Sequence, residues 1–115
     1  MKIRIAACLL VVCSIVSCAP SSEDRASRLF QEQFKAAEQG QAEAQYTLGF
    51  MYAKGEGVPQ DDAEAYTWFA VAVANGPAHA KDNLAMVKSR LNQEQLAAAQ
   101  QRATQLFEQI NTKKK

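Results

Sequence analysis

A pattern of small residues that recurs after 36 positions constrains this chain more than any other feature. Gly40, Ala42, Ala44 and Leu48 in the first copy correspond to Gly76, Ala78, Ala80 and Leu84 in the second. Repeats of this length, each formed by a pair of helices, are typical of solenoids, in which every repeat buries its faces on its neighbours. The sequence therefore predicts a stack of helix pairs.

The spacing of apolar residues predicts an all-α chain of about five helices. A first helix over residues 23–39 has apolar residues at three- and four-residue steps. It is expected to end before Gly40, because glycine takes the left-handed conformation of a helix end at little cost. A second helix should end at residues 55–59, which contain two glycines and a proline. No segment shows the sustained polar–apolar alternation of a strand.

The later helices have recognisable starts. Asp61 is a predicted N-cap, with Glu64 as its capping-box partner three residues on. Pro77 is expected in the first turn of a fourth helix, where its missing N–H costs nothing. Asn92 and Gln95 form a second capping-box pattern ahead of a fifth helix. The many glutamines along these helices are interpreted as uncharged, solvent-facing residues.

Three runs of residues and one turn carry a family resemblance. They are Gly40-Gln41-Ala42-Glu43-Ala44-Gln45, Leu48-Gly49-Phe50-Met51-Tyr52 and Gly55-Glu56-Gly57-Val58-Pro59-Gln60-Asp61, followed by Ala65, Trp68 and the turn Asn75-Gly76. This pattern resembles the Sel-one-like repeat family, relatives of the tetratricopeptide repeat. It covers one full repeat, about residues 40–75, and a degenerate repeat with a closing helix over residues 76–110. The resemblance implies a short right-handed solenoid of antiparallel helix pairs that serves as a protein-interaction scaffold, with no cofactor and no reaction.

Residues 1–17 have the pattern of a targeting segment. Lys2 and Arg4 form a short cationic start, and an apolar run from Ile5 to Val16 follows. This run is well short of the roughly 20 apolar residues that a membrane-spanning helix needs, so no permanent transmembrane anchor is expected.

The end of the apolar run, Ile15-Val16-Ser17-Cys18, resembles the bacterial lipobox. The resemblance implies cleavage before Cys18 and attachment of lipid to Cys18. Because Ala19 rather than aspartate follows the cysteine, it also implies delivery to the outer membrane, facing the periplasm. Residues 18–24 would then form the lipidated N-terminus and a tether that reaches about 20 Å. Ordinary secretory cleavage after Ala19 is the alternative, since Ser17 and Ala19 also fit the small-x-small rule.

Cleavage before Cys18 would restrict the chemistry of the mature chain. Cys8 and Cys13 would be lost and Cys18 acylated, which leaves neither a disulfide nor a free thiolate. His79 is the single histidine and has Asp82 as its one neighbouring carboxylate, which is less than a metal site requires. We therefore predict no catalytic residue, no metal site and no cofactor, and we expect His79 to face solvent.

Charged residues show no concentration that points to a site. The chain has 13 basic and 12 acidic residues, so no nucleic-acid surface is expected. Asp61, Asp62 and Glu64 could form an acid–base cluster, but a helix start favours negative charge and explains them without chemistry. The basic tail, residues 113–115, is expected either to be solvated or to touch anionic lipid.

Four aromatic residues are candidates for the core or for binding. Trp68 and Phe69 lie on the predicted core stripe of the third helix. Tyr46 and Phe50 point almost opposite Leu48 in a helix, although both are large and aromatic. They either pack on the next helix of the solenoid or serve as anchors for a protein partner.

These features predict a non-enzymatic, membrane-tethered interaction scaffold of the bacterial cell envelope, with its helical domain over residues 25–112. A protein partner of unknown identity is expected, and self-association is left open. One alternative is an assembly or stability subunit of a larger envelope complex, because around three repeats are normally needed for an independent solenoid. A cell-wall-acting enzyme is the less favoured alternative, since a nucleophile, a base and an orienting group do not occur together.

Overall fold

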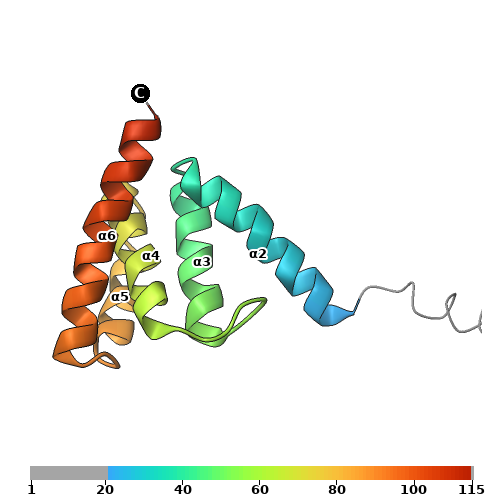
Figure 1. The fold of residues 1–115 in the computed structure, drawn as a ribbon, viewed down its shortest axis with the longest axis horizontal. Helices are drawn as coiled ribbons and strands as arrows, with labels where there is room; N and C mark the ends of the chain where they lie inside the picture. The colour runs from blue at the N-terminus through green and yellow to red at the C-terminus, as the bar shows by residue number, and fades with distance from the viewer. Residues whose placement is uncertain (1–20, 115) are drawn as a thin grey trace, which may run out of the picture.

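The computed structural model of the chain describes residues 21–114, which form five α-helices and no strand (Figure 1). The helices are α2 (Ser22–Glu38), α3 (Ala42–Lys54), α4 (Asp62–Asn75), α5 (Ala80–Lys88) and α6 (Gln93–Lys113). The predicted all-α fold is confirmed over these residues. None of these helices is long and apolar enough to cross a membrane.

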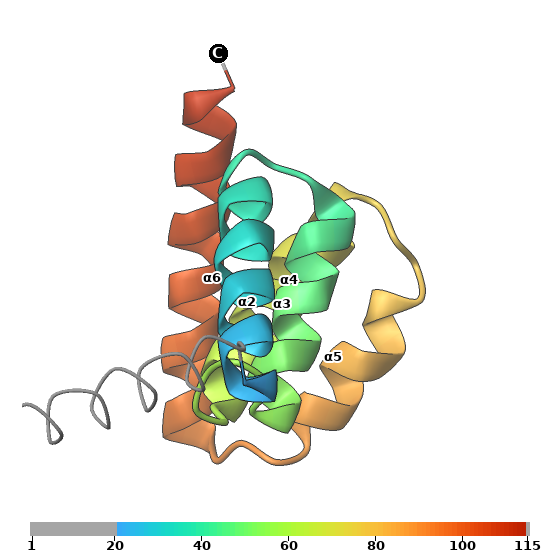
Figure 2. The ribbon, with the colours of Figure 1, turned by 90° about the vertical axis from the view of Figure 1, so that its right-hand side faces the viewer.

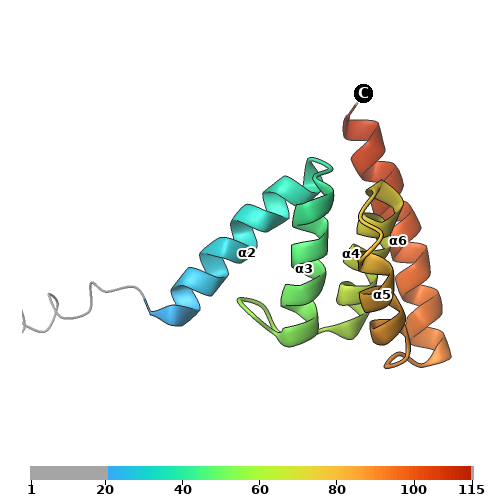
Figure 3. The same cartoon turned by 180° about the vertical axis from the view of Figure 1, so that it is seen from behind.

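The helices lie side by side as a short solenoid. α3 and α4 form an antiparallel pair, with α2 on one side and α6 on the other (Figure 1). α2 meets α3 at the turn that joins them and diverges from it toward its own N-terminus, as the view from behind also shows (Figure 3). The short α5 packs on α4 and lies apart from α6 (Figure 2). The first repeat is therefore a regular helix pair, whereas both helices of the second repeat pack mainly on α4.

The hydrophobic core is organised around α4. Trp68 and Phe69 are adjacent in the sequence, are 2% and 0% exposed, and belong to two different clusters. The Trp68 cluster joins α4 to α2, α3 and α6. The Phe69 cluster joins α4 to α3, α5 and the first half of α6. The core role predicted for both residues is confirmed.

Gly49, in the middle of α3, allows α3 to approach α4 closely. A methyl group added at Gly49 would lie 2.5 Å from two ring atoms of Phe69. Phe69 is fully buried in a close-packed core, so its ring has little room to move. A mid-helix glycine costs about 1 kcal/mol relative to alanine, and this close contact explains why the helix has one.

The start of α2 differs from the prediction. The helix begins at Ser22, inside the segment expected to be a tether. The reason is a capping box: the Asp24 N–H donates to Ser21 Oγ at 3.3 Å, and the Ser21 N–H donates to Asp24 Oδ2 at 3.2 Å. The folded domain therefore starts a few residues earlier than residue 25.

The starts of the last two helices were predicted with mixed success. α5 begins at Ala80 and not in a turn that contains Pro77. The Ala80 N–H donates to the Pro77 carbonyl three residues back, so residues 77–79 form a tighter turn that precedes the α-helix. The capping box of Asn92 and Gln95 at the start of α6 is confirmed.

Candidate interaction surface

Tyr46 and Phe50 lie one helical turn apart on α3 and pack against each other. Their ring centroids are 4.9 Å apart, and the ring planes are nearly perpendicular. Both rings also meet Phe69 of α4, at 5.8 Å and 5.6 Å between centroids. Aromatic pairs of this kind contribute about 0.5–1.5 kcal/mol each beyond the burial of their area. The core therefore fixes both side chains, while part of each remains exposed.

The start of α5 covers one side of Tyr46. The ring of His79 lies 4.6 Å from the Tyr46 ring, edge to face, and Asn83 Nδ2 donates to Tyr46 Oη at 2.9 Å. His79 is exposed, as predicted, but it occupies the N-cap position of α5 and not the helix itself. Tyr46 thus packs on the next helix, which was one of the two predicted alternatives. The binding role of Tyr46 and Phe50 stays a prediction.

An exposed methionine continues this surface onto α5. Met86 is 45% exposed and follows Phe50 by the 36 residues of the repeat. It shares one side of α5 with Asn83, three residues earlier, whose amide contacts Tyr46. At the other edge, Lys54 Nζ lies 5.4 Å from the centre of the Phe50 ring. We call the surface formed by Tyr46, Phe50, Lys54, Asn83 and Met86 the α3/α5 face.

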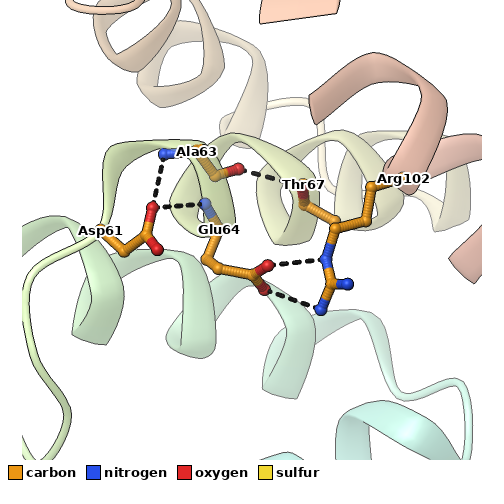
Figure 4. A network of polar contacts seen from close by, with 5 residues as sticks. All are labelled: Asp61, Ala63, Glu64, Thr67 and Arg102. Atoms are coloured by element: carbon orange, nitrogen blue, oxygen red, sulfur yellow. Dashed lines mark hydrogen bonds and ion pairs between the residues drawn. The ribbon is translucent and has the colours of Figure 1, made fainter. Parts of the chain in front are cut away.

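The carboxylates at the start of α4 have structural partners. Asp61 Oδ1 accepts the N–H groups of Ala63, at 3.0 Å, and Glu64, at 3.1 Å (Figure 4). The prediction that Glu64 completes a capping box is wrong, because its carboxylate turns to Arg102 of α6. The two N···O distances of that pair are 2.6 Å and 3.3 Å. The Arg102 side chain is 61% exposed, so this bidentate pair contributes at most about 1 kcal/mol.

Tyr52 of α3 lies in the field of the same charged groups. Burial raises the pKa of the Tyr52 phenol above the ordinary value of 10.0, the carboxylates of Glu64 and Asp61 raise it further, and Arg102 lowers it. A phenol whose pKa is raised by folding favours the folded state most below the unfolded pKa. That contribution to stability is lost as the pH rises above the ordinary tyrosine value.

Replacing Glu64 with glutamine should lower the pKa of Tyr52 and still leave it above the ordinary value, because burial is the larger cause. The measurement is phenolate absorbance during alkaline titration, in a background that carries Tyr46→Phe and Tyr66→Phe. Glu43→Gln, on an exposed part of α3, is the matched control and should leave the titration unchanged. An equal shift in both variants would show that Glu64 has no specific effect on Tyr52.

Two further predictions concern a metal site and the lipidation site, and only the first falls within the described residues. Within residues 21–114, no group of three or more histidine, cysteine, aspartate or glutamate side chains is placed to hold a metal ion. Cys18, the predicted lipidation site, lies outside the described residues, and its role stays a prediction.

One buried polar network was missed because the glutamines were interpreted as solvent-facing. Gln45 is 0% exposed. Its Nε2 donates to the Ala37 carbonyl at 3.1 Å, and its Oε1 accepts from Asn75 Nδ2 at 2.8 Å. Gln45 therefore joins the end of α2 to the end of α4. The one available signal was its position on the buried side of α3, between Ala44 and Leu48.

Comparisons with known proteins match the regular helix pair. Residues 42–77, which include all of α3 and α4, match the family model described as Sel1 repeat. A segment of 66 residues is 38% identical to chitin synthase regulatory factor 3 of Schizosaccharomyces pombe. This segment is 57% of the present chain and only 6% of that protein. Residues 42–77 are therefore similar to a Sel1 repeat, and α3 and α4 form a tetratricopeptide-like helix pair.

Proposed function

We propose that this chain is a non-enzymatic adaptor of the bacterial cell envelope. It binds a protein partner through the α3/α5 face, and lipid on Cys18 holds it to the outer membrane on the periplasmic side. The observation that carries the binding role is the α3/α5 face, where the core fixes two partly exposed aromatic rings of α3 and Met86 of α5 is exposed. The Sel1 match supports the same role, because Sel1 repeats imply protein partners.

The α3/α5 face has the composition of an interface core. Aromatic residues and methionine are enriched at the centres of protein interfaces. The rings of Tyr46 and Phe50 are already held by Phe69, so a partner would not have to order them on binding. Methionine adapts to irregular apolar surfaces, and Lys54 supplies a polar edge. An apolar side chain of a partner can therefore pack on the exposed parts of Phe50 and Met86.

The binding role predicts a specific effect of a charge at residue 86. A photo-crosslinking amino acid at residue 86, in cells with their native envelope, should give one discrete protein adduct. With that partner purified, Met86→Glu should weaken binding at least about tenfold, because a buried unpaired charge costs well over 1.4 kcal/mol.

The control for this experiment is the same substitution at the other exposed large apolar residue. Leu29 is 46% exposed, nearly the same as Met86, but lies on α2 at the far end of the solenoid. Leu29→Glu should leave the affinity unchanged, and neither variant should alter the melting temperature by more than a few degrees. Equal affinity of the Met86→Glu variant and the unmodified protein would refute the α3/α5 face as the binding surface.

The anchoring role depends on one residue. Mass spectrometry of the native chain should show an N-terminus at Cys18 that carries acyl groups. Cys18→Ser should abolish both the acylation and the cleavage before residue 18, so the chain should keep the mass of the uncleaved precursor. A native N-terminus at Pro20 without acyl groups would instead establish secretory cleavage after Ala19.

A further inference from the structure

The two faces of α2 differ sharply in character. One face packs in the core through Phe30, Phe34 and Ala37, which are buried or partly buried. The opposite face consists of exposed residues at three- and four-residue steps: Arg25, Arg28, Leu29, Glu32 and Lys35. We call these five residues the α2 outer face. It includes one of the two large hydrophobic residues that are exposed in the described chain.

The α2 outer face carries net positive charge. Three basic residues against Glu32 and Asp24, which lies one turn before Arg28 at the edge of this face, give a net charge of +1 (3 − 2). The Asp24 carboxylate also accepts the Ser21 N–H. Among residues 21–114, neither of the two ion pairs involves α2, so its cations are available to an anionic surface. At the far end of α2, the side chain of Lys114 lies against Gly40 and adds another cation.

The proposed anchor lies close to this face. Ser21, the N-cap of α2, follows the lipid-bearing Cys18 by three residues. Three extended residues span only about 10 Å, so the start of α2 has to remain within about one helix diameter of the membrane surface. α2 itself has 17 residues, a length of about 25 Å. The tether therefore fixes the height of the start of α2 above the membrane, but α2 can still stand upright on the surface or lie flat along it.

The position of α2 in the stack permits the flat orientation. α2 is the outermost helix at one end of the solenoid, and α5 and α6 lie at the other end (Figures 1 and 2). A planar surface can therefore meet the α2 outer face without a clash with another helix. In that orientation α5, which carries Met86, lies at the end of the solenoid that is farther from the membrane.

We infer that α2 lies flat on the membrane that holds the anchor, with its outer face on the headgroups of anionic phospholipids. This inference rests on the anchoring at Cys18 proposed above. Leu29 enters the interface, and Arg25, Arg28 and Lys35 meet lipid phosphates. Each net positive charge near an anionic leaflet favours contact about fivefold, so a net charge of +1 favours the flat orientation about fivefold. This is sufficient to orient the domain, because the anchor already holds it at the surface.

The test measures the distance of the far end of α2 from the membrane. A nitroxide is attached at Gln39→Cys, an exposed residue at the C-terminal end of α2, or at Met86→Cys as the distant reference. The acylated chain is placed in vesicles of phosphatidylcholine with or without phosphatidylglycerol. With phosphatidylglycerol, collisions with a lipid-bound nickel chelate should be at least about fivefold more frequent at residue 39 than at residue 86. Without it, this difference should shrink severalfold.

Two charge-removal variants separate position from total charge. The variant Arg25→Gln, Arg28→Gln, Lys35→Gln should lose the difference between the two labels. The matched control, Lys81→Gln, Lys88→Gln, Arg90→Gln, removes the same three charges from exposed positions on α5 and just after it and should retain it. All six residues are exposed, so circular dichroism should show the same helix content in both variants.

The outcomes distinguish this inference from the anchoring on which it rests. Flotation of the chain with vesicles of phosphatidylcholine alone reports the anchor, because these vesicles have no anionic headgroups for α2. A chain that does not float overturns both proposals. A chain that floats and gives equal collision rates at residues 39 and 86 overturns only the orientation of α2, as does a loss of the difference in both charge-removal variants.

Discussion

Replacing Trp68 with alanine should destabilise the folded chain by about 3–5 kcal/mol, the usual cost of truncating a buried tryptophan. Trp68 is 2% exposed and belongs to the cluster that joins four helices. Its ring meets Phe34 of α2 edge to face, at 5.8 Å between centroids, so its loss also loosens α2. Domains of this size are stable by only about 5–15 kcal/mol, so a large share of the stability would be lost. Urea unfolding followed by circular dichroism measures the change.

Two further substitutions make the Trp68 experiment specific. Met86→Ala removes a large side chain that is 45% exposed and should change stability by less than about 0.5 kcal/mol. Trp68→Phe should cost much less than alanine. Trp68 Nε1 is buried without a hydrogen-bond partner among the described residues, so phenylalanine removes an unsatisfied donor together with part of the ring. If Trp68→Ala costs no more than Met86→Ala, the proposed core is wrong.

Replacing Gln45 with methionine should cost about 2–4 kcal/mol, because a buried carbonyl loses its partner at about 1–3 kcal/mol and a partly buried amide loses one hydrogen bond at about 0.5–1.5 kcal/mol. Methionine has nearly the shape of glutamine, so the cost would come from hydrogen bonding and not from a cavity. The groups left without a partner are the Ala37 carbonyl and the Asn75 side-chain amide. The change in the midpoint of urea unfolding measures this loss.

A surface glutamine and a double mutant test the cause of that loss. Gln101→Met, on the exposed side of α6, should be nearly neutral. Asn75→Ala combined with Gln45→Met should cost less than the sum of the two single changes, because the first removes the amide that the second leaves unpaired. Additive losses would show that Gln45 and Asn75 do not act as one network.

The sequence was sufficient to predict the helices and most of the core. Apolar residues recur at three- and four-residue steps on the side of a helix that is buried. This pattern correctly assigns Trp68 and Leu48 to the core, and both are at most 2% exposed. The capping box of Asn92 and Gln95 was also predictable, because it requires only residues three positions apart. Helix caps and buried helix faces depend on residues that are close together in the sequence, so local patterns are sufficient to predict them.

Features that depend on contacts between helices were not predictable. The spacing of Asp61 and Glu64 fits a capping box, but an arginine 38 residues away attracts the Glu64 carboxylate instead. Gln45 looks like a surface residue until α2 and α4 are placed beside it. In each case a partner that is distant in the sequence decides which of two local arrangements forms.

The candidate binding surface was half predicted. Tyr46 and Phe50 stand out because they are aromatic and point away from the apolar stripe of α3. The contribution of Asn83 and Met86 was missed, since it depends on the way α5 packs beside α3. The repeat offset could have indicated Met86, which takes the place of Phe50 36 residues later.

The central place of α4 affects how the chain unfolds and how it could grow. Long solenoids unfold repeat by repeat, because each repeat contacts only its neighbours. Here a single helix contributes Trp68 to one cluster and Phe69 to the other, and it contacts α3, α5 and α6 directly. The domain should therefore unfold as one cooperative unit, with its slowest amide exchange in α4. An added repeat would be tolerated only outside α2 or α6, because an insertion beside α4 would separate Trp68 from Phe34 or Phe69 from α5.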